Sequence, residues 1–234
     1  MKRAVLDAVI AARAEKRALA LATNLKSGAQ LAITEADSLG DLESSPAISA
    51  AAADALRHDK PVTIASDEGS VFIQPFNPPL RMFIVGGVHI AQALAPMGAL
   101  AGYDVTVNDP RGSFASKDRF PSIALSDQWP DEALAAYAPD SRTAIVTLTH
   151  DPKLDDPALA MGLRSPAFYI GALGSRKTHA ARLERLAGLG FSDTDLSRIH
   201  GPLGLALGGR SPAEIAIAAL AQATQSLHEN GQQK

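Results

Sequence analysis

The spacing of hydrophobic residues differs between the first third of the chain and the rest. In residues 2–16 the apolar positions recur at helical spacing, which predicts an amphipathic helix, and the alanine-rich residues 46–58 predict a second one. Short apolar runs bounded by turn residues predict two hairpins, formed by residues 18–23 with 29–34 and by residues 62–65 with 71–74. Together these elements indicate a small α+β unit.

Beyond residue 80, continuous apolar runs alternate with helical stretches. The four expected strands are residues 82–85, 105–107, 144–148 and 168–170, and the helices between and after them are residues 90–101, 131–137, 155–163 and 175–186. A last helix begins at Ser211-Pro212-Ala213-Glu214, where serine, proline and glutamate occupy the positions of a capping box. This alternation predicts βαβ units, and hence a doubly wound, Rossmann-like parallel sheet with helices on both faces.

The proline-rich segment between these two patterns marks the expected domain boundary. Pro75, Pro78 and Pro79 remove backbone donors and fix φ, so this segment cannot continue a helix or a central strand. We therefore predict an α/β protein with a small N-terminal α+β domain, residues 1–77, followed by a Rossmann-like domain, residues 80–234.

Composition narrows the function classes. The 234 residues include 22 Lys+Arg and 25 Asp+Glu, for a net charge of -3, with no basic stripe for a nucleic acid. There is no cysteine, which excludes disulfides and thiolate metal sites on this chain. No apolar run approaches the roughly 20 residues that span a bilayer, and the N-terminus lacks the apolar core of a signal peptide. We expect a soluble, cytoplasmic protein.

The first predicted strand of the larger domain leads into Gly86-Gly87-Val88-His89, and the second ends at Asp109. This is the layout of one dinucleotide-binding half of a Rossmann fold, in which a strand leads through a glycine-rich turn into a helix and the next strand ends at an acidic residue. Val88, however, occupies the position of the second glycine, which normally lets the backbone approach a pyrophosphate. The motif favours the Rossmann-like fold, and leaves open dinucleotide binding or a purely structural turn.

A second glycine turn follows the strand at 168–170, in the segment from Gly171 to Lys177. Gly171, Gly174 and an N-cap serine, Ser175, lead into a helix whose first N–H groups have no helical partner. Arg176 and Lys177 place cations against the helix dipole, which a bound phosphate would compensate. The alternative is that both are solvated surface charges, because basic residues recur along this helix.

Histidines lie near the ends of two strands. His150 and Asp151 follow the strand at 144–148, and His200 lies in an irregular segment. Because ligands of doubly wound sheets bind outside the carboxyl ends of the strands, Gly86, Asp109, His150 and Gly174 should converge at one edge. No set of His, Asp and Glu has metal-ligand spacing, and no Ser–His–acid arrangement stands out.

Four ordered segments resemble the XdhC/CoxI family. They begin at Leu148, Tyr169, Arg198 and Ser211 and read LTHDPKLD, YIGALGSRKTH, RIHGPLGL and SPAEIA. The resemblance implies a Rossmann-like C-terminal domain, homodimerisation, and a role in binding molybdenum cofactor and passing it to an apo molybdenum hydroxylase of the xanthine-dehydrogenase type, in step with a cysteine-desulfurase-type sulfurase.

The residues expected to contact the cofactor lie at the strand ends and in the resembling segments. They are Gly86, Gly87, His89, Asp109, His150, Asp151, Gly171, Gly174, Ser175, Arg176, Lys177, His179 and His200. The N-terminal third departs from the family, whose members carry a Gly-Ser-Thr-Pro-Arg-like and a Gly-Cys segment where this chain has TNLKSGAQ and LGDLE. The N-terminal domain is therefore expected to be trimmed.

Two alternative functions are retained. One is an NAD(P)-dependent oxidoreductase, in which Asp109 would hold the ribose hydroxyls and His150 would serve as the acid. The other is a non-catalytic Rossmann module that binds a ligand or regulates a partner. Pterin bound to the purified protein would favour the cofactor-binding role, whereas affinity for NADH would favour the oxidoreductase.

Overall fold

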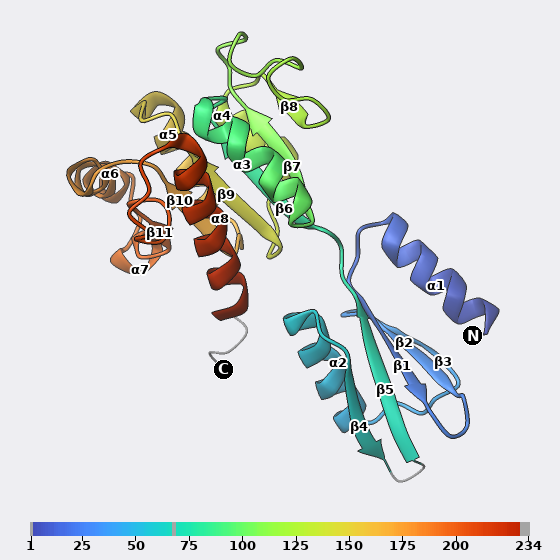
Figure 1. Ribbon diagram of the computed structural model, residues 1–234. Helices are drawn as coiled ribbons and strands as arrows, with labels where there is room; N and C mark the ends of the chain where they lie inside the picture. The colour runs from blue at the N-terminus through green and yellow to red at the C-terminus, as the bar shows by residue number, and fades with distance from the viewer. Residues whose placement is uncertain (1, 67–68, 230–234) are drawn as a thin grey trace. The chain divides into compact units, whose positions relative to one another are not determined.

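The computed structural model describes residues 2–66 and 69–229. The chain divides into two compact units, an N-terminal unit of residues 1–79 and a C-terminal unit of residues 80–234 (Figure 1). Throughout residues 2–66 and 69–229, no helix has both the length and the apolar character needed to cross a membrane.

The N-terminal unit is an antiparallel sheet with a helix on each face. Its strands are β1 (Leu19–Asn24), β2 (Gln30–Ile33), β3 (Ser38–Gly40), β4 (Val62–Ser66) and β5 (Gly69–Phe76), in the order β3-β2-β1-β5-β4. Alternate residues of β1 point to opposite faces. Leu19 and Leu21 pack with α1 (Arg3–Ala14), while Ala20 and Ala22 pack with α2 (Pro46–His58).

The C-terminal unit contains a parallel sheet of six strands. These are β6 (Leu80–Val85), β7 (Tyr103–Asn108), β8 (Ala124–Ser126), β9 (Thr143–Thr147), β10 (Tyr169–Ala172) and β11 (Ile199–His200). The helices are α3 (His89–Leu100), α4 (Pro130–Tyr137), α5 (Pro152–Arg164), α6 (Arg176–Gly188), α7 (Asp193–Leu196) and α8 (Pro212–Glu229). The strand order β11-β10-β9-β6-β7-β8 is that of a Rossmann sheet. The chain builds the sheet outward from β6 in one direction, through β7 to β8, and then crosses to β9 and builds it in the other direction.

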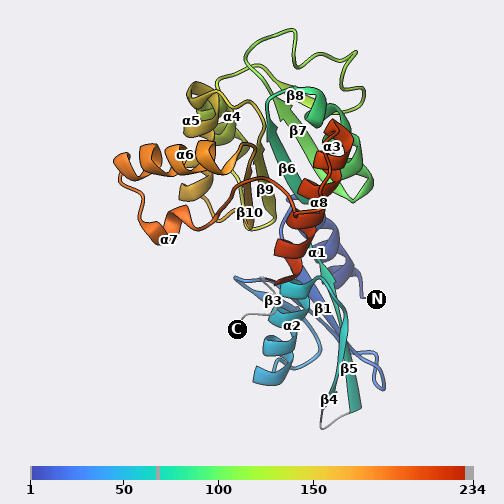
Figure 2. The same ribbon diagram turned by 60° about the vertical axis from the view of Figure 1, so that its left-hand side comes forward.

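Helices cover both faces of this sheet. Met82 and Ile84 of β6 pack on the face covered by α3 and α8, and Phe83 and Val85 pack on the face covered by α4 and α5. Figure 2 shows α3 and α8 side by side, with α4, α5 and α6 on the other side of the strands. Because both faces are buried, the strands read as continuous apolar runs.

The predicted fold class is confirmed, with corrections at short elements. Strands β3, β8 and β11 and helix α7 were not predicted, because two to four residues carry too little periodicity. Gly171 lies inside β10 rather than in the following turn, paired with Val146 and His200. His200 lies in the short strand β11 rather than in an irregular segment.

The assignment of residues 1–77 and 80–234 to two domains that fold independently remains a prediction. Residues 80–234 contain two hydrophobic clusters of their own, one on each face of the parallel sheet. We therefore expect the fragment 80–234, expressed alone, to unfold in one cooperative thermal transition followed by circular dichroism. A broad, non-cooperative melt would contradict this independence.

Candidate functional site

The carboxyl ends of β6, β7, β9 and β10 meet at one edge of the parallel sheet. The turns that follow these strands touch one another there. A Cβ added to Gly86 would meet the side chain of Thr149 at 2.7 Å, and the N–H of Gly87 donates to Asp109 Oδ2 at 2.9 Å. The predicted convergence of Gly86 with the segments of Asp109 and His150 therefore follows from the connectivity of the sheet.

The first glycine turn is closed by the chain itself. A side chain at Gly87 would collide with the carbonyl group of Phe114, because the loop after β7 packs directly on this backbone. Val88 is half-buried against the cluster on the α3 side. Gly87 thus permits the close approach of a loop rather than of a pyrophosphate.

Asp109 is fully buried and already engaged. Its Oδ1 accepts hydrogen bonds from the backbone N–H of Arg111 at 3.0 Å and from Arg111 Nε at 2.9 Å. Its Oδ2 accepts hydrogen bonds from Arg111 Nη2 at 2.7 Å and from the backbone N–H of Gly87. Burial would raise the pKa of Asp109, but the hydrogen bonds from Arg111 and Gly87 outweigh it and lower the pKa. This carboxylate therefore holds the arginine and the turn, and both of its oxygens are engaged within the chain.

Replacing Gly87 with alanine should destabilise the protein by about 1–3 kcal/mol, the usual cost of overpacking. The added methyl group must displace the Phe114 backbone, and with it the loop that covers the turn. Chemical denaturation measures the change. Gly188→Ala is the matched control, because nothing lies within 4 Å of that position in α6; a Gly87→Ala variant as stable as this control would contradict the packing role.

The turn between β9 and α5 is organised by a buried carboxylate, Asp155. Its Oδ1 accepts from Thr149 Oγ1 at 2.6 Å, and its Oδ2 accepts from the backbone N–H of His150 at 3.1 Å. Burial raises the pKa of Asp155. His150 has a left-handed φ of 63° and an exposed side chain, and Asp151 caps α5 by accepting from the N–H of Lys153. The turn therefore presents His150 outward on a fixed backbone.

The turn between β10 and α6 has the features of an anion site. Ser175 is the N-cap, and its Oγ accepts from the N–H of Thr178 at 3.1 Å. The backbone N–H groups of residues 174–177 donate to no described residue. Arg176 and Lys177 are exposed and form no ion pair with the described part of the chain, and the first turn of α6 has no acidic residue. Free N–H groups and uncompensated cations favour an oxyanion here.

A buried arginine joins these two turns. Arg182, in the second turn of α6, is 1% exposed; its Nη2 donates to the carbonyl of Leu173 at 2.8 Å and lies 3.5 Å from Asp155 Oδ2. Its Nε and Nη1 are buried and have no partner among the described residues. Burial lowers the pKa of Arg182, while Asp155 opposes that change. Arg182 therefore connects the β9–α5 turn to the β10–α6 turn from beneath.

The other predicted residues have different positions. His89 is exposed at the first residue of α3, and the ring of His200 stacks on Tyr169 with centroids 4.9 Å apart. The ring of His179 packs against Gly201, and burial followed by the charge of Arg182 lowers its pKa. A side chain at Gly171 would collide with Tyr169 and Leu203, so this glycine serves packing. Gly171 and His200 pair with each other at the carboxyl ends of β10 and β11, and the role of these residues in binding a ligand stays a prediction.

Sequence reasoning missed Arg111, Thr149, Asp155 and Arg182. Two of them carried a readable signal. Arg182 is four residues before the buried Leu186, and Asp155 is four residues before the buried Leu159, so each charge lies on the apolar stripe of its helix. Opposite charges on the buried stripes of successive helices predict a buried pair.

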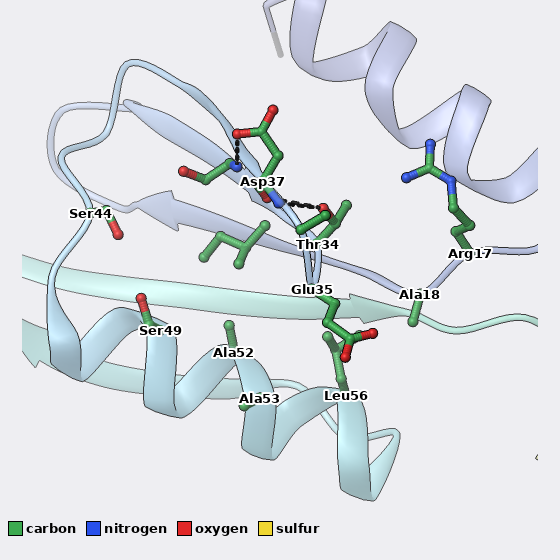
Figure 3. Close-up of a pocket in the computed structure, with 13 residues that line it drawn as sticks. Arg17, Ala18, Thr34, Glu35, Asp37, Ser44, Ser49, Ala52, Ala53 and Leu56 are labelled. Carbon is green, nitrogen blue, oxygen red and sulfur yellow. Dashed lines mark hydrogen bonds between the residues drawn. The ribbon is translucent and has the colours of Figure 1, made fainter. Parts of the chain in front are cut away.

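A separate cavity of about 980 Å³ lies in the N-terminal unit, between α2 and the turn that joins β2 to β3 (Figure 3). Small side chains of α2, Ser49, Ala52 and Ala53, form one wall, and Thr34 and Asp37 lie opposite. None of its lining residues carries a buried polar atom that lacks a partner in the described ranges.

Comparison with solved structures identifies the same fold. A crystal structure described as a xanthine dehydrogenase from Bacillus halodurans aligns with a TM-score of 0.73 and 20% sequence identity, over 97% of this chain and 65% of that one. At this identity the likeness concerns the fold alone.

Comparison with known sequences identifies relatives and a family. The chain is 33% identical over 155 residues to the molybdenum cofactor insertion chaperone PaoD of Escherichia coli K12. The aligned residues make up 66% of this chain and 42% of the relative. It is 27% identical over 160 residues to a probable xanthine dehydrogenase subunit of Bacillus subtilis 168, covering 67% of this chain and 46% of the relative. The chain thus spans less than half of either relative. Residues 82–223 match the family described as the XdhC Rossmann domain, and because this is more than half of the chain, the protein belongs to that family.

Proposed function

We propose that this protein is an accessory factor that binds molybdenum cofactor and delivers it to an apo molybdenum hydroxylase of the xanthine-dehydrogenase type. The family and the names of the relatives support an accessory role. The cofactor is cargo here, held and released, so the chain needs to bind, orient and shield it. Positioning and exclusion of water suffice for this task.

The observation that carries the proposal is the contrast between the two glycine turns. The Gly87 turn is covered by the Phe114 loop, whereas the β10–α6 turn has four successive N–H groups without a described partner, with Arg176 and Lys177 beside them. We therefore expect the cargo's phosphate or pyrophosphate to bind at this second turn. His150 and Asp151, on the neighbouring turn, would then be available to contact the pterin part of the cargo.

The NAD(P)-dependent alternative has less support. Its ribose-binding acid, Asp109, already accepts four hydrogen bonds from Arg111 and Gly87. A dinucleotide at the first turn would also have to displace the loop at Phe114.

Pterin fluorescence tests the proposal. The full chain is purified from a molybdenum-replete host, the bound material is oxidised, and the fluorescent pterin is quantified per protein chain. We expect pterin in the wild-type protein and no change in its retention on adding NADH. Protein without pterin that binds NADH tightly would overturn the proposal in favour of the oxidoreductase.

Partners follow from the same proposal. A sulfurase of the cysteine-desulfurase type would act on the bound cofactor, since this chain has no cysteine that could carry sulfur. We also predict a homodimer, chiefly because the resemblance to the XdhC/CoxI family implies one; small apolar residues in α8, of which Ala213 is exposed, would also permit close helix contacts. Sedimentation at micromolar concentration should give twice the mass of the 24.4 kDa chain; a monomer would contradict the prediction.

A further inference from the structure

His150 has a backbone conformation that is unfavourable for a residue with a side chain. Its φ of 63° lies in the left-handed region, where the Cβ crowds the carbonyl oxygen and glycine is the favoured residue. Lys16, Asp59 and Ala138 share this region of φ, but they lie at the C-terminal ends of helices, where a left-handed residue is common. Ser122 lies in a turn of the long loop before β8. His150 instead lies between β9 and the N-cap of α5, so no helix end accounts for its conformation.

Hydrogen bonds to a buried carboxylate hold His150 in this conformation. Asp155, which is 1% exposed, accepts the backbone N–H of His150 at 3.1 Å and the hydroxyl of Thr149 at 2.6 Å. The same hydroxyl oxygen accepts the N–H of Asp151 at 3.1 Å. The backbone is thus fixed on both sides of His150, and a strained residue persists only where its surroundings determine it in this way. Glycine would fit the same turn without strain, so the turn itself does not require a histidine.

The imidazole of His150 contributes no interaction to the folded chain. It is exposed, and it forms no hydrogen bond, ion pair or ring contact with residues 2–66 and 69–229. The rings of His179 and His200, by contrast, pack against Gly201 and Tyr169. A residue that destabilises its turn through the backbone, and makes no stabilising contact through its side chain, points to a contact outside the chain.

His150 also lies where a doubly wound sheet binds its ligands. It follows β9, which lies beside β6 where the order of the strands changes direction, and ligands bind outside the carboxyl ends of the strands at such a point. The turns after β6 and β9 meet there, since a Cβ added to Gly86 would lie 2.7 Å from the Thr149 side chain. Asp151 is already engaged, because its carboxylate caps α5 by accepting the N–H of Lys153. The imidazole of His150 is therefore the side chain of this turn that is available to a ligand.

We propose that His150 is the residue through which the β9–α5 turn contacts the pterin ring of the cargo, and that the chain keeps a strained backbone there for the sake of this contact. The inference rests on the proposed function for the identity of the ligand. A neutral imidazole has one N–H donor and one nitrogen acceptor in a rigid plane. The edge of a pterin carries amide and amino groups that donate and accept hydrogen bonds, so the two rings can bond edge to edge. Glycine, which would relax the backbone, has no group for this contact.

Exchanging His150 for glycine tests this assignment, because strain and contact predict opposite effects. His150→Gly in the full chain should raise the melting temperature by about 2 °C or more, since the left-handed backbone is relaxed. The same variant should bind neopterin monophosphate about tenfold more weakly, as followed by pterin fluorescence. Ala138→Gly is the matched control, because this exposed residue has a φ of 49° at the end of α4. It should also melt at a higher temperature, but should bind the probe like the wild type.

Two results would overturn the proposal directly. A lower melting temperature in His150→Gly would mean that the imidazole stabilises the fold, and unchanged affinity for neopterin monophosphate would mean that it does not contact the pterin. In proton–carbon spectra of the wild type, the imidazole signals that His150→Gly removes should shift on adding the probe. A loss of affinity without such a shift would be an indirect effect of the backbone and would contradict the contact.

The outcome is separable from that of the proposed function. Pterin that co-purifies in equal amounts with the wild type and with His150→Gly would refute the contact at His150 and keep the cofactor role. A wild type that neither carries pterin nor binds neopterin monophosphate would refute the cofactor role, and the contact with it.

Discussion

Replacing Asp155 with alanine should lower the free energy of unfolding by about 3–5 kcal/mol, as when one partner of a buried pair is removed. The change removes the acceptor for Thr149 Oγ1 and for the His150 N–H, and removes the carboxylate that is paired with the buried Arg182. Urea denaturation of the full chain measures it.

The neighbouring Asp156→Ala is the control for this effect. Asp156 pairs with Arg185, and their side chains are 14% and 41% exposed, so its loss should cost less than that of the buried Asp155, about 1 kcal/mol. Equal stability of the two variants would mean that Asp155 does not organise the β9–α5 turn.

Replacing Arg176 with alanine should weaken binding of the molybdenum cofactor by about tenfold, or ~1.4 kcal/mol, at an unchanged melting temperature. Arg176 is exposed in the first turn of α6 and has no described partner, so its removal costs little stability. Its charge-assisted hydrogen bonds to a phosphate are each expected to contribute roughly 1.5–3 kcal/mol.

Cofactor titrations and thermal melts compare Arg176→Ala with Arg185→Ala, a loss of the same charge on the same helix. Arg185 lies in the last turn of α6, away from the predicted phosphate, and its replacement should leave affinity near that of the wild type. Parent-like binding by Arg176→Ala together with loss of binding in Gly87→Ala would move the site to the first glycine turn.

The larger elements could be predicted from the sequence because their patterns are long. The six-stranded sheet is buried on both faces, so four of its strands appear as unbroken apolar runs, and the capping box of Ser211 and Glu214 marks the start of α8 in both sequence and structure. Strands β8 and β11 are held by pairing with neighbouring strands rather than by their own pattern.

The candidate site was only partly predictable, because glycines and charges have more than one physical cause. Gly87 and Gly171 resemble ligand-binding glycines in the sequence, yet the first accommodates the Phe114 backbone and the second the Tyr169 ring. The tertiary contacts that decide this come from the folded chain rather than from the local pattern. Ser175, by contrast, was predictable as an N-cap, since its role depends on its immediate neighbours.

For a charged residue such as Arg182, too, the local sequence does not show the tertiary contacts that decide its role. As a sequence position it belongs to a generally basic helix, and only its spacing from Leu186 hints at burial. The structure adds its connection to Leu173 and Asp155, which makes it part of the turn above it.

Reconstitution is the decisive test of cofactor delivery. The full chain, isolated with its molybdenum cofactor, is mixed with an apo molybdenum hydroxylase of the xanthine-dehydrogenase type in the absence of free cofactor, and hydroxylase activity is followed with time. We predict that activity appears in proportion to the pterin that leaves the chain. No gain in activity, with the same apoenzyme fully activated by free cofactor, would contradict delivery by this protein.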